Sequence, residues 1–368
     1  ALILTTAGDI VLNAAMTADG DAAAVAAAGV AQNADIAAGG DLYVQALGGD
    51  VAMADGTSGT AGGNLRYAAA ADILVGALAA AGDASLVAGN DILDNTALEA
   101  ANVTAQGLRL AAGGSVGAGG GTQSDANAAA LNTAVANLEA AAGQNIYVDE
   151  LDAVTAGGVD GTAADLARFD SGTTSVPDGD LAGINAAAGV AKLKAGGTVT
   201  VAETFAAGTD ALILTTAGDI VLNADVTAGG DAAVVAAAGV AQNADIAAGG
   251  DLAVAARGGS VVMAPGTEGV SSGGNIIYGA MGDVALGHLT AADAVSVQAL
   301  VGNITDANAD ETANITAQRA QLFATGSIGI AAGTESDTNL GALDLTVDNV
   351  EAFAGVDLYL QSLNVIEI

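Results

Sequence analysis

Hydrophobic and small polar positions alternate along this chain in short stretches that are separated by glycine and aspartate. Residues 10–12, 42–44 and 73–75 are such stretches, and each follows a small residue and an aspartate. Alternation with a period of two residues is typical of a β-strand with one buried face. A small residue before aspartate favours a tight turn, because the aspartate side chain bonds nearby backbone amides. The pattern therefore predicts short strands joined by turns.

The turn signal recurs at a regular spacing. A small residue followed by Asp or Asn occurs at 20–21, 40–41, 63–64, 82–83 and 101–102, and a second series lies between these positions. Each period of roughly 20 residues thus holds two turn-and-strand units. Periods of this length indicate a solenoid, in which each coil packs only on its neighbours. We therefore predict an all-β fold, a parallel β-helix with roughly 20 residues per coil.

A longer duplication lies above this short period. Residues 1–50 and 211–260 differ at only eight positions, and the correspondence continues to the C-terminus with two one-residue shifts. The chain is therefore divided into β-helix copy 1 at 1–154 and β-helix copy 2 at 191–368. The segment 155–190 between them loses the rhythm, and we interpret it as an irregular linker or a loop excursion with a helical turn around 165–169.

Comparison of the two copies predicts which side chains face inward. In the stretch 42–47 every second position varies, so that Tyr43 corresponds to Ala253 and Leu47 to Arg257. The unchanged Leu, Val and Ala between them are expected inside, and the variable side chains are expected in solvent.

The same comparison decides an ambiguous segment. Residues 130–143 could form an alanine-rich helix, but their counterpart at 342–355 alternates in the manner of a strand. We predict strands in both copies.

Composition restricts the function classes. Hydrophobic residues make up 52% of the 368 residues, yet aromatic residues are only 2% and glycine occurs 53 times, which suits a narrow interior filled by small side chains. The 42 acidic and 7 basic residues give a net charge of −35. Such a surface repels nucleic acid and attracts a diffuse cloud of cations. There is no cysteine, and no apolar run approaches the length that crosses a bilayer.

Catalytic chemistry finds little support in the sequence. Enzymes of parallel β-helix fold that act on polysaccharides need clustered carboxylates with Arg or Lys. The basic residues here are dispersed along the chain: Arg66, Arg109, Arg168, Lys192, Lys194, Arg257 and Arg319. The single histidine, His288, is expected to face solvent. We predict no enzyme activity and assign no catalytic or cofactor-binding residue.

Three short motifs are candidate sites. Asp306, Asn308 and Asp310 have the first spacings of a calcium loop, but the segment lacks the glycine and glutamate that complete one. We expect weak, diffuse calcium binding and no specific metal site. The glycine-rich stretch 113–121 lacks the lysine of a phosphate loop. Glycosylation sequons occur at 102–104, 303–305 and 314–316.

Three segments carry a resemblance to a known family. "GGDLAVAARGGSVVMA", "TAGGDAAVVAAAGVAQNADIAAGGDL" and "VDNVEAFAGVDLYLQSLN" resemble the repeats of giant secreted bacterial adhesins of the filamentous haemagglutinin and β-strand-repeat type. The resemblance covers the chain apart from 155–190. It implies a right-handed parallel β-helix, export to the cell exterior, and a role in adhesion or surface structure.

These observations lead to a functional expectation. We expect a non-enzymatic extracellular shaft of a giant adhesin or a cell-surface filament. The alternatives are a filament or sheath subunit that assembles head to tail, and a carbohydrate-active β-helix enzyme. The repeat pattern is already under way at Ala1 and continues to Ile368. The expected partners are therefore further repeats or identical copies stacked end to end, besides a cell-surface or glycan target that the sequence does not specify. Nucleic acid and membrane insertion are not expected.

Overall fold

The computed structural model describes residues 1–97, 100–118, 129–167, 172–308, 312–330 and 341–364. Within these ranges the secondary structure is entirely β, without a helix. Parallel strands stack about 21 residues apart and form a right-handed parallel β-helix of about 16 turns. The predicted fold class and coil length are therefore confirmed. The chain divides into two compact units, unit 1 at Ala1–Leu193 and unit 2 at Lys194–Ile368, and each is described by itself.

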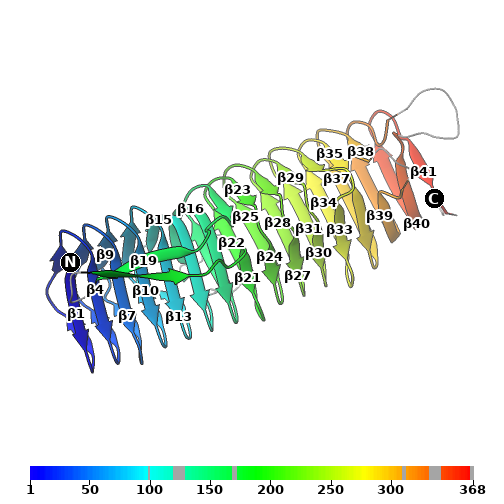
Figure 1. Cartoon of the computed structure of the whole chain (residues 1–368). Coiled ribbons are helices and arrows are strands. Elements are labelled where there is room, and N and C mark those ends of the chain that lie inside the picture. The colour runs from blue at the N-terminus through cyan, green and yellow to red at the C-terminus, as the bar shows by residue number, and fades with distance from the viewer. Residues whose placement is uncertain (98–99, 119–128, 168–171, 309–311, 331–340, 365–368) are drawn as a thin grey trace. The chain divides into compact units, whose positions relative to one another are not determined.

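The strands of unit 1 form three parallel ladders, which we name faces A, B and C (Figure 1). Face A holds β1 (Leu2–Thr6), β4 (Ala22–Ala26), β7 (Leu42–Ala46), β10 (Leu65–Ala69), β13 (Ala84–Ala88), β15 (Val103–Ala112) and β16 (Leu131–Ala142). Face B holds β2 (Ile10–Leu12), β5 (Val30–Gln32), β8 (Val51–Met53), β11 (Ile73–Val75) and β14 (Ile92–Asp94). Face C holds β3 (Met16–Ala18), β6 (Ile36–Ala38), β9 (Ser58–Ala61) and β12 (Ala77–Ala80), followed by the N-terminal parts of β15 and β16. The remaining strands are β17 (Ile146–Glu150), β18 (Val154–Ala156), β19 (Thr162–Ala167), β20 (Thr173–Asp178), β21 (Ile184–Ala186) and β22 (Ala191–Ala195).

Unit 2 repeats the three ladders. Face A holds β25 (Ala211–Thr215), β28 (Ala232–Ala236), β31 (Leu252–Ala256), β34 (Ile276–Ala280), β37 (Ala294–Ala299), β39 (Ile315–Ala324) and β40 (Leu343–Ala354). Face B holds β23 (Val199–Val201), β26 (Ile220–Leu222), β29 (Val240–Gln242), β32 (Val261–Met263), β35 (Val284–Leu286) and β38 (Ile304–Asp306). Face C holds β24 (Phe205–Ala207), β27 (Val226–Ala228), β30 (Ile246–Ala248), β33 (Glu268–Ser271) and β36 (His288–Ala291), and β41 (Leu360–Ser362) pairs with β40.

The interior is built as the alternation predicts. Leu42, Val44 and Ala46 of β7 are buried, and their counterparts on β31 are buried in the same alternating pattern. Short aliphatic side chains stack on the equivalent residue of the next coil, and the apolar surface that they remove from water stabilises each coil on its neighbours. Segments 131–142 and 343–354 are strands β16 and β40, so the strand prediction is confirmed there.

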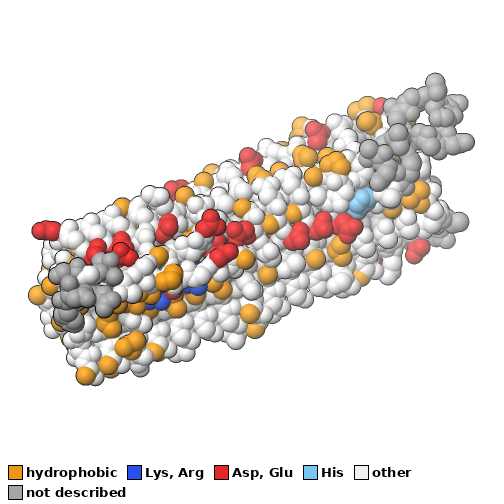
Figure 2. All heavy atoms as spheres, viewed as in Figure 1, with side chains coloured by type: hydrophobic (Ala, Val, Ile, Leu, Met, Phe, Trp, Pro, Cys, Tyr) orange, Lys and Arg blue, Asp and Glu red, His pale blue; other side chains and the backbone are white. Residues whose placement is uncertain are grey.

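Aspartates at the turns join one coil to the next. Asp41 Oδ1 accepts a hydrogen bond of 2.8 Å from the backbone N–H of Asn64, its register partner on the following coil. Asp21 stands in the same relation to Asp41, and in unit 2 Asp231 to Asp251. The glycine before the donor residue leaves space for this bond, since a Cβ added at Gly63, which precedes Asn64, would lie 2.1 Å from Asp41 Oδ1. These turn aspartates are therefore structural acceptors as well as surface charges, and acidic side chains recur across the visible face of the molecule (Figure 2).

Segment 155–190 contains an antiparallel hairpin, in which β19 pairs with β20. The helical turn expected around 165–169 is wrong over 165–167, which belong to β19, and residues 168–169 lie outside the described ranges. The hairpin extends across β4, β7 and β10 on face A of unit 1 (Figure 1). Tyr43, expected in solvent, is only 3% exposed because the hairpin lies over it. The outward face of this ladder is thus a second buried layer.

Candidate functional site

The most elaborate side-chain cluster of unit 1 lies between face A and the hairpin. Successive strands of face A place one outward residue each in register, and we name this set the covered row: Ala23, Tyr43, Arg66, Ser85, Arg109 and Glu139. None of these residues is more than 9% exposed. Parallel pairing without a bulge keeps every second side chain on the same side, which aligns the row along the ladder.

Arg66 is the centre of the cluster. Its Nε donates to Asp178 Oδ2 at 2.8 Å and its Nη2 donates to Asp178 Oδ1 at 3.0 Å, a bidentate pair. Ser85 Oγ donates to the same carboxylate at 2.7 Å. Burial alone raises the pKa of Asp178, but these hydrogen bonds and the charges of Arg66 and Arg109 outweigh it and lower the pKa below its ordinary value.

Tyr43 completes the contacts of Arg66. The guanidinium carbon lies 5.3 Å from the centre of the Tyr43 ring, a cation–π geometry, and Nη1 donates to the phenol oxygen at 3.2 Å. Burial raises the pKa of Tyr43, and the neighbouring Arg66 charge opposes the rise. The ring is also packed against Ala23 and Ala164, which joins the ion pair to an apolar contact.

The side chain of Arg109 binds the backbone of the segment that follows the hairpin. Its Nε donates to the carbonyl oxygen of Gly179 at 2.5 Å, and burial lowers its pKa. Nη1 is buried without a hydrogen-bond partner among the described residues. Arg109 therefore holds the segment that follows Asp178, two pairings along the ladder from Arg66.

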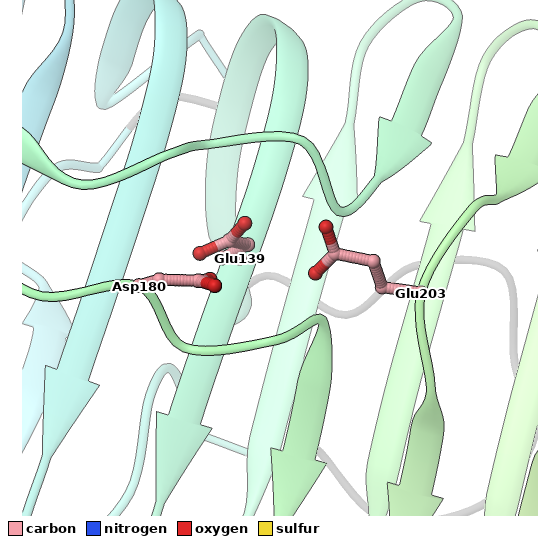
Figure 3. Close-up of side chains that lie close together, drawn as sticks. All are labelled: Glu139, Asp180 and Glu203. Atoms are coloured by element: carbon pink, nitrogen blue, oxygen red, sulfur yellow. The ribbon is translucent and has the colours of Figure 1, made fainter.

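Glu139 clamps the two ends of the excursion. Oε1 accepts from the backbone N–H of Val159 at 2.8 Å, and Oε2 accepts from that of Leu181 at 3.0 Å. Figure 3 shows Glu139 beside Asp180, and carboxylate oxygens of the two lie within 4.8 Å of each other. Asp180 Oδ1 in turn accepts from the N–H of Ala182, which has a positive φ of 56°. Both oxygens of Glu139 thus bind the backbone of the hairpin base.

The residues of the covered row fix the hairpin on face A of unit 1. Arg66 and Asp178 satisfy each other in a bidentate pair whose side chains are each 10% exposed. The carboxylate oxygens of Glu139 accept hydrogen bonds from two backbone amides at the base of the hairpin. Buried, mutually paired groups of this kind fix one geometry, and removing one partner leaves an uncompensated charge.

The sequence prediction of dispersed basic residues is wrong for two of them. Arg66 and Arg109 occupy the same row, two pairings apart, and both hold the hairpin. One signal could have indicated this. Both arginines are at outward positions in copy 1, and both are replaced in copy 2, by Ile277 and Gln321.

The side chains of the calcium-loop candidate form hydrogen bonds within the protein. Asp306 Oδ1 accepts from Asn308 N–H and from the side chain of Asn314, and Asn308 Oδ1 accepts from Gly266 N–H. Asp310 lies outside the described residues. Asp306 Oδ1 therefore accepts hydrogen bonds from its own stretch of chain, and Asn308 Oδ1 accepts one from an earlier coil.

The remaining motifs also fall on structural positions. His288 on β36, expected in solvent, is half-buried, and its Nδ1 lies 3.0 Å from the carbonyl oxygen of Ala313. Asn102 and Asn314, the acceptors of two sequons, are fully buried, and each side-chain oxygen accepts a backbone N–H of the next coil. Both asparagines are inaccessible to glycosylation once the coils have formed.

Comparison with known proteins adds no assignment. The chain matches no protein-family model, no curated protein and no solved structure. Among the described residues, none form a helix long and apolar enough to span a membrane. The site and the fold together define a right-handed parallel β-helix with a hairpin bound across one face of unit 1.

Proposed function

We propose that this chain is a non-enzymatic structural segment of an extracellular shaft, belonging to a giant adhesin or a surface filament. The observation that carries the proposal is the series of turn aspartates that bond one coil to the next. In unit 1 the series includes Asp21, Asp41 and Asn64, and in unit 2 it includes Asp210, Asp231 and Asp251. Side chains used in this way add links between coils to those of the backbone ladders.

The physical reasoning concerns load along the stacking direction. Within each unit, parallel backbone bonds on faces A, B and C hold the described coils to their neighbours, and each such bond is individually modest. The aspartate bonds add a charge-assisted acceptor at the corners, where the ladders are interrupted. A net charge of −35 gives the exterior a repulsive field that opposes lateral bundling. Both properties suit a long, isolated, load-bearing solenoid.

A mechanical experiment tests this function. The full chain, tethered at both ends, is extended with optical tweezers, and the Asp41→Ala and Asp231→Ala variants are compared with wild type. We expect stepwise unfolding of coils, with a lower force for the first steps in each variant. Asp55→Ala is the control, because Asp55 follows β8 at an exposed turn. Extension without resistance in the wild type would contradict a load-bearing role.

Location and assembly are tested separately. An antibody against the folded chain should label the outer surface of intact source cells. Labelling confined to the cell interior would exclude an extracellular shaft. Purified chains that form long filaments by electron microscopy would instead favour the self-assembling subunit, and hydrolysis of a polysaccharide panel would favour the enzyme.

A further inference from the structure

Face A of unit 2 carries the counterparts of the covered row, but there they face solvent. Strand register aligns Ala233, Ala253, Ile277, Ser296, Gln321 and Glu351, which we name the open row. Ile277 is 52% exposed, and Gln321 and Glu351 are also exposed. Two duplicated stretches with the same ladder thus present the same row in two states, one beneath a hairpin and one open.

The open row and its flank carry apolar side chains at positions where unit 1 has a charged or a small residue. Arg66 corresponds to Ile277, and the flanking alanine of β16 at position 141 corresponds to Phe353, which is 57% exposed. Phe353 stacks on Phe323, with ring centres 5.3 Å apart and planes inclined by 14°. A shallow hollow beside the stack is lined by Gln298, Leu300, Gln321, Phe323, Glu351 and Phe353. Exposed aromatic residues around a hollow are typical of a surface that binds another polypeptide.

The carboxylate that clamps the hairpin base is retained. Glu351 has the register position of Glu139, which accepts the N–H groups of Val159 and Leu181 in unit 1. In unit 2 this carboxylate is exposed on the row, in position to accept the same type of backbone donor. The open row therefore keeps the carboxylate that binds a hairpin backbone, Glu351. It differs at the position that binds a hairpin side chain, where Ile277 replaces Arg66.

We infer that face A of unit 2 binds a β-hairpin supplied by another polypeptide, with the hairpin base on β39 and β40 and the hairpin across β37, β34, β31 and β28. The hairpin of unit 1 lies in the same way, with its base on β15 and β16 and β19 across β10, β7 and β4. Backbone N–H groups at the base of this hairpin donate to Glu351, and its apolar side chains pack on Ile277 and the phenylalanine stack. The inference concerns a binding surface and is independent of the proposed mechanical function.

The differences between the rows specify the occupant. An acidic residue at the position of Asp178 would lie against Ile277 and be buried without the ion pair of unit 1, with Ser296 at the position of Ser85 as its hydroxyl donor, so the occupant is apolar there. Arg319 stands at the position of Gly107, where an added Cβ would already lie 3.3 Å from Val159 Cγ1. The occupant therefore needs glycine in place of that valine.

A peptide experiment tests the inference on the full chain. The probe peptide has the sequence of 158–181 with Val159→Gly and Asp178→Leu, and a cysteine added at each end is oxidised to close the hairpin. The control peptide has the same closure and the unchanged sequence. We expect the probe to bind in the micromolar range and to slow amide exchange in β34, β37 and β39, and the control to bind at least about tenfold more weakly.

Protein variants make the test specific to the open row. Phe353→Ser and Glu351→Gln should each weaken probe binding by about tenfold or more, since they remove the aromatic contact and the charged acceptor. Val262→Ser is the matched control, because Val262 is 48% exposed on face B. Ile277→Arg should reverse the preference at this position, so that a peptide with Val159→Gly and an unchanged Asp178 binds better than the probe.

Three outcomes would overturn the inference. The first is that neither peptide protects unit 2 at millimolar concentration. The second is protection confined to faces B or C. The third is a chain that dimerises in sedimentation equilibrium without peptide and becomes monomeric on Phe353→Ser, because the occupant would then be a second copy of this face.

Discussion

Arg66 on β10 and Asp178 on β20 are 112 residues apart in the sequence and form a bidentate ion pair at 2.8 and 3.0 Å. The pair joins the outward side of a solenoid coil to a hairpin that lies more than 100 residues further along the sequence. Because both side chains are only 10% exposed, removing one partner costs the docked hairpin more than it would in an ion pair in solvent.

A double-mutant cycle should measure this coupling. Arg66→Met and Asp178→Leu should each loosen the hairpin by about 3 kcal/mol, since each leaves a buried charge alone. The double variant should recover much of that loss, because two apolar groups then face each other. Amide exchange of β19 and β20 reports the local free energy. Arg319→Met, which removes an exposed pair with Asp293, should cost at most about 1 kcal/mol. Additive single effects would show that the two residues act independently.

Acid should release the hairpin. The pKa of Asp178 is lowered in the folded chain, so its contribution to docking is complete above its ordinary value of 3.8. That contribution is lost as the pH falls below 3.8 through the lowered pKa, because the protonated carboxyl no longer forms the ion pair. Exchange in β19 and β20, corrected for intrinsic rates, should accelerate in this range. In Asp178→Asn the exchange should be fast already near neutral pH and change little on acidification.

The solenoid could be predicted because its determinants are local and repeated. Inward residues such as Leu42 and Val44 recur with a period of two, and each coil contacts only the coils beside it. Turn aspartates such as Asp41 mark the corners in the same rhythm. A short stretch of sequence therefore contains most of the information that its fold requires.

The covered row could not be predicted in the same way. Tyr43 and Arg66 occupy outward positions, where alternation predicts only solvent. Their burial depends on Asp178 and Ala164, which lie in a segment without periodicity and at large sequence separation. Only the contrast between the two copies, with Arg66 replaced by Ile277, contained the signal.

Raising the pH from 4.5 to about 7 should weaken the coil that holds Glu150. Burial raises the pKa of this carboxyl to about 7, although hydrogen bonds from Thr133 Oγ1 and Val135 N–H oppose the rise. The folded state therefore holds the proton more tightly than the unfolded state, whose pKa is near the ordinary 4.5. The stabilisation is complete below pH 4.5, declines as the pH rises to about 7, and is absent above it.

The Glu150→Gln variant isolates this effect. Thermal unfolding of wild type and variant is measured from about pH 4 to pH 8. The melting temperature of wild type minus that of the variant should fall by a few degrees between the two pKa values and then level off. A difference that stays constant over this range would show that Glu150 titrates normally.

A glycine whose added Cβ would meet the turn aspartate of the preceding coil should be intolerant of any side chain. In Gly63→Ala the new Cβ would lie 2.1 Å from Asp41 Oδ1, so the acceptor must move and the bond to Asn64 is strained. We expect a loss of about 1–3 kcal/mol, measured by chemical denaturation. Gly8→Ala is the control, since nothing lies within 4 Å of its added Cβ, and it should be neutral or slightly stabilising.

A second substitution shows whether the clash is with the aspartate itself. In the double variant of Gly63→Ala and Asp41→Ala, the Cβ no longer meets a carboxylate. The cost of Gly63→Ala should therefore be smaller in this background than in wild type, by roughly 1 kcal/mol or more. An equal cost in both backgrounds would assign the intolerance to the backbone at position 63. The aspartate bond would then be a consequence of the turn and not the reason for its glycine.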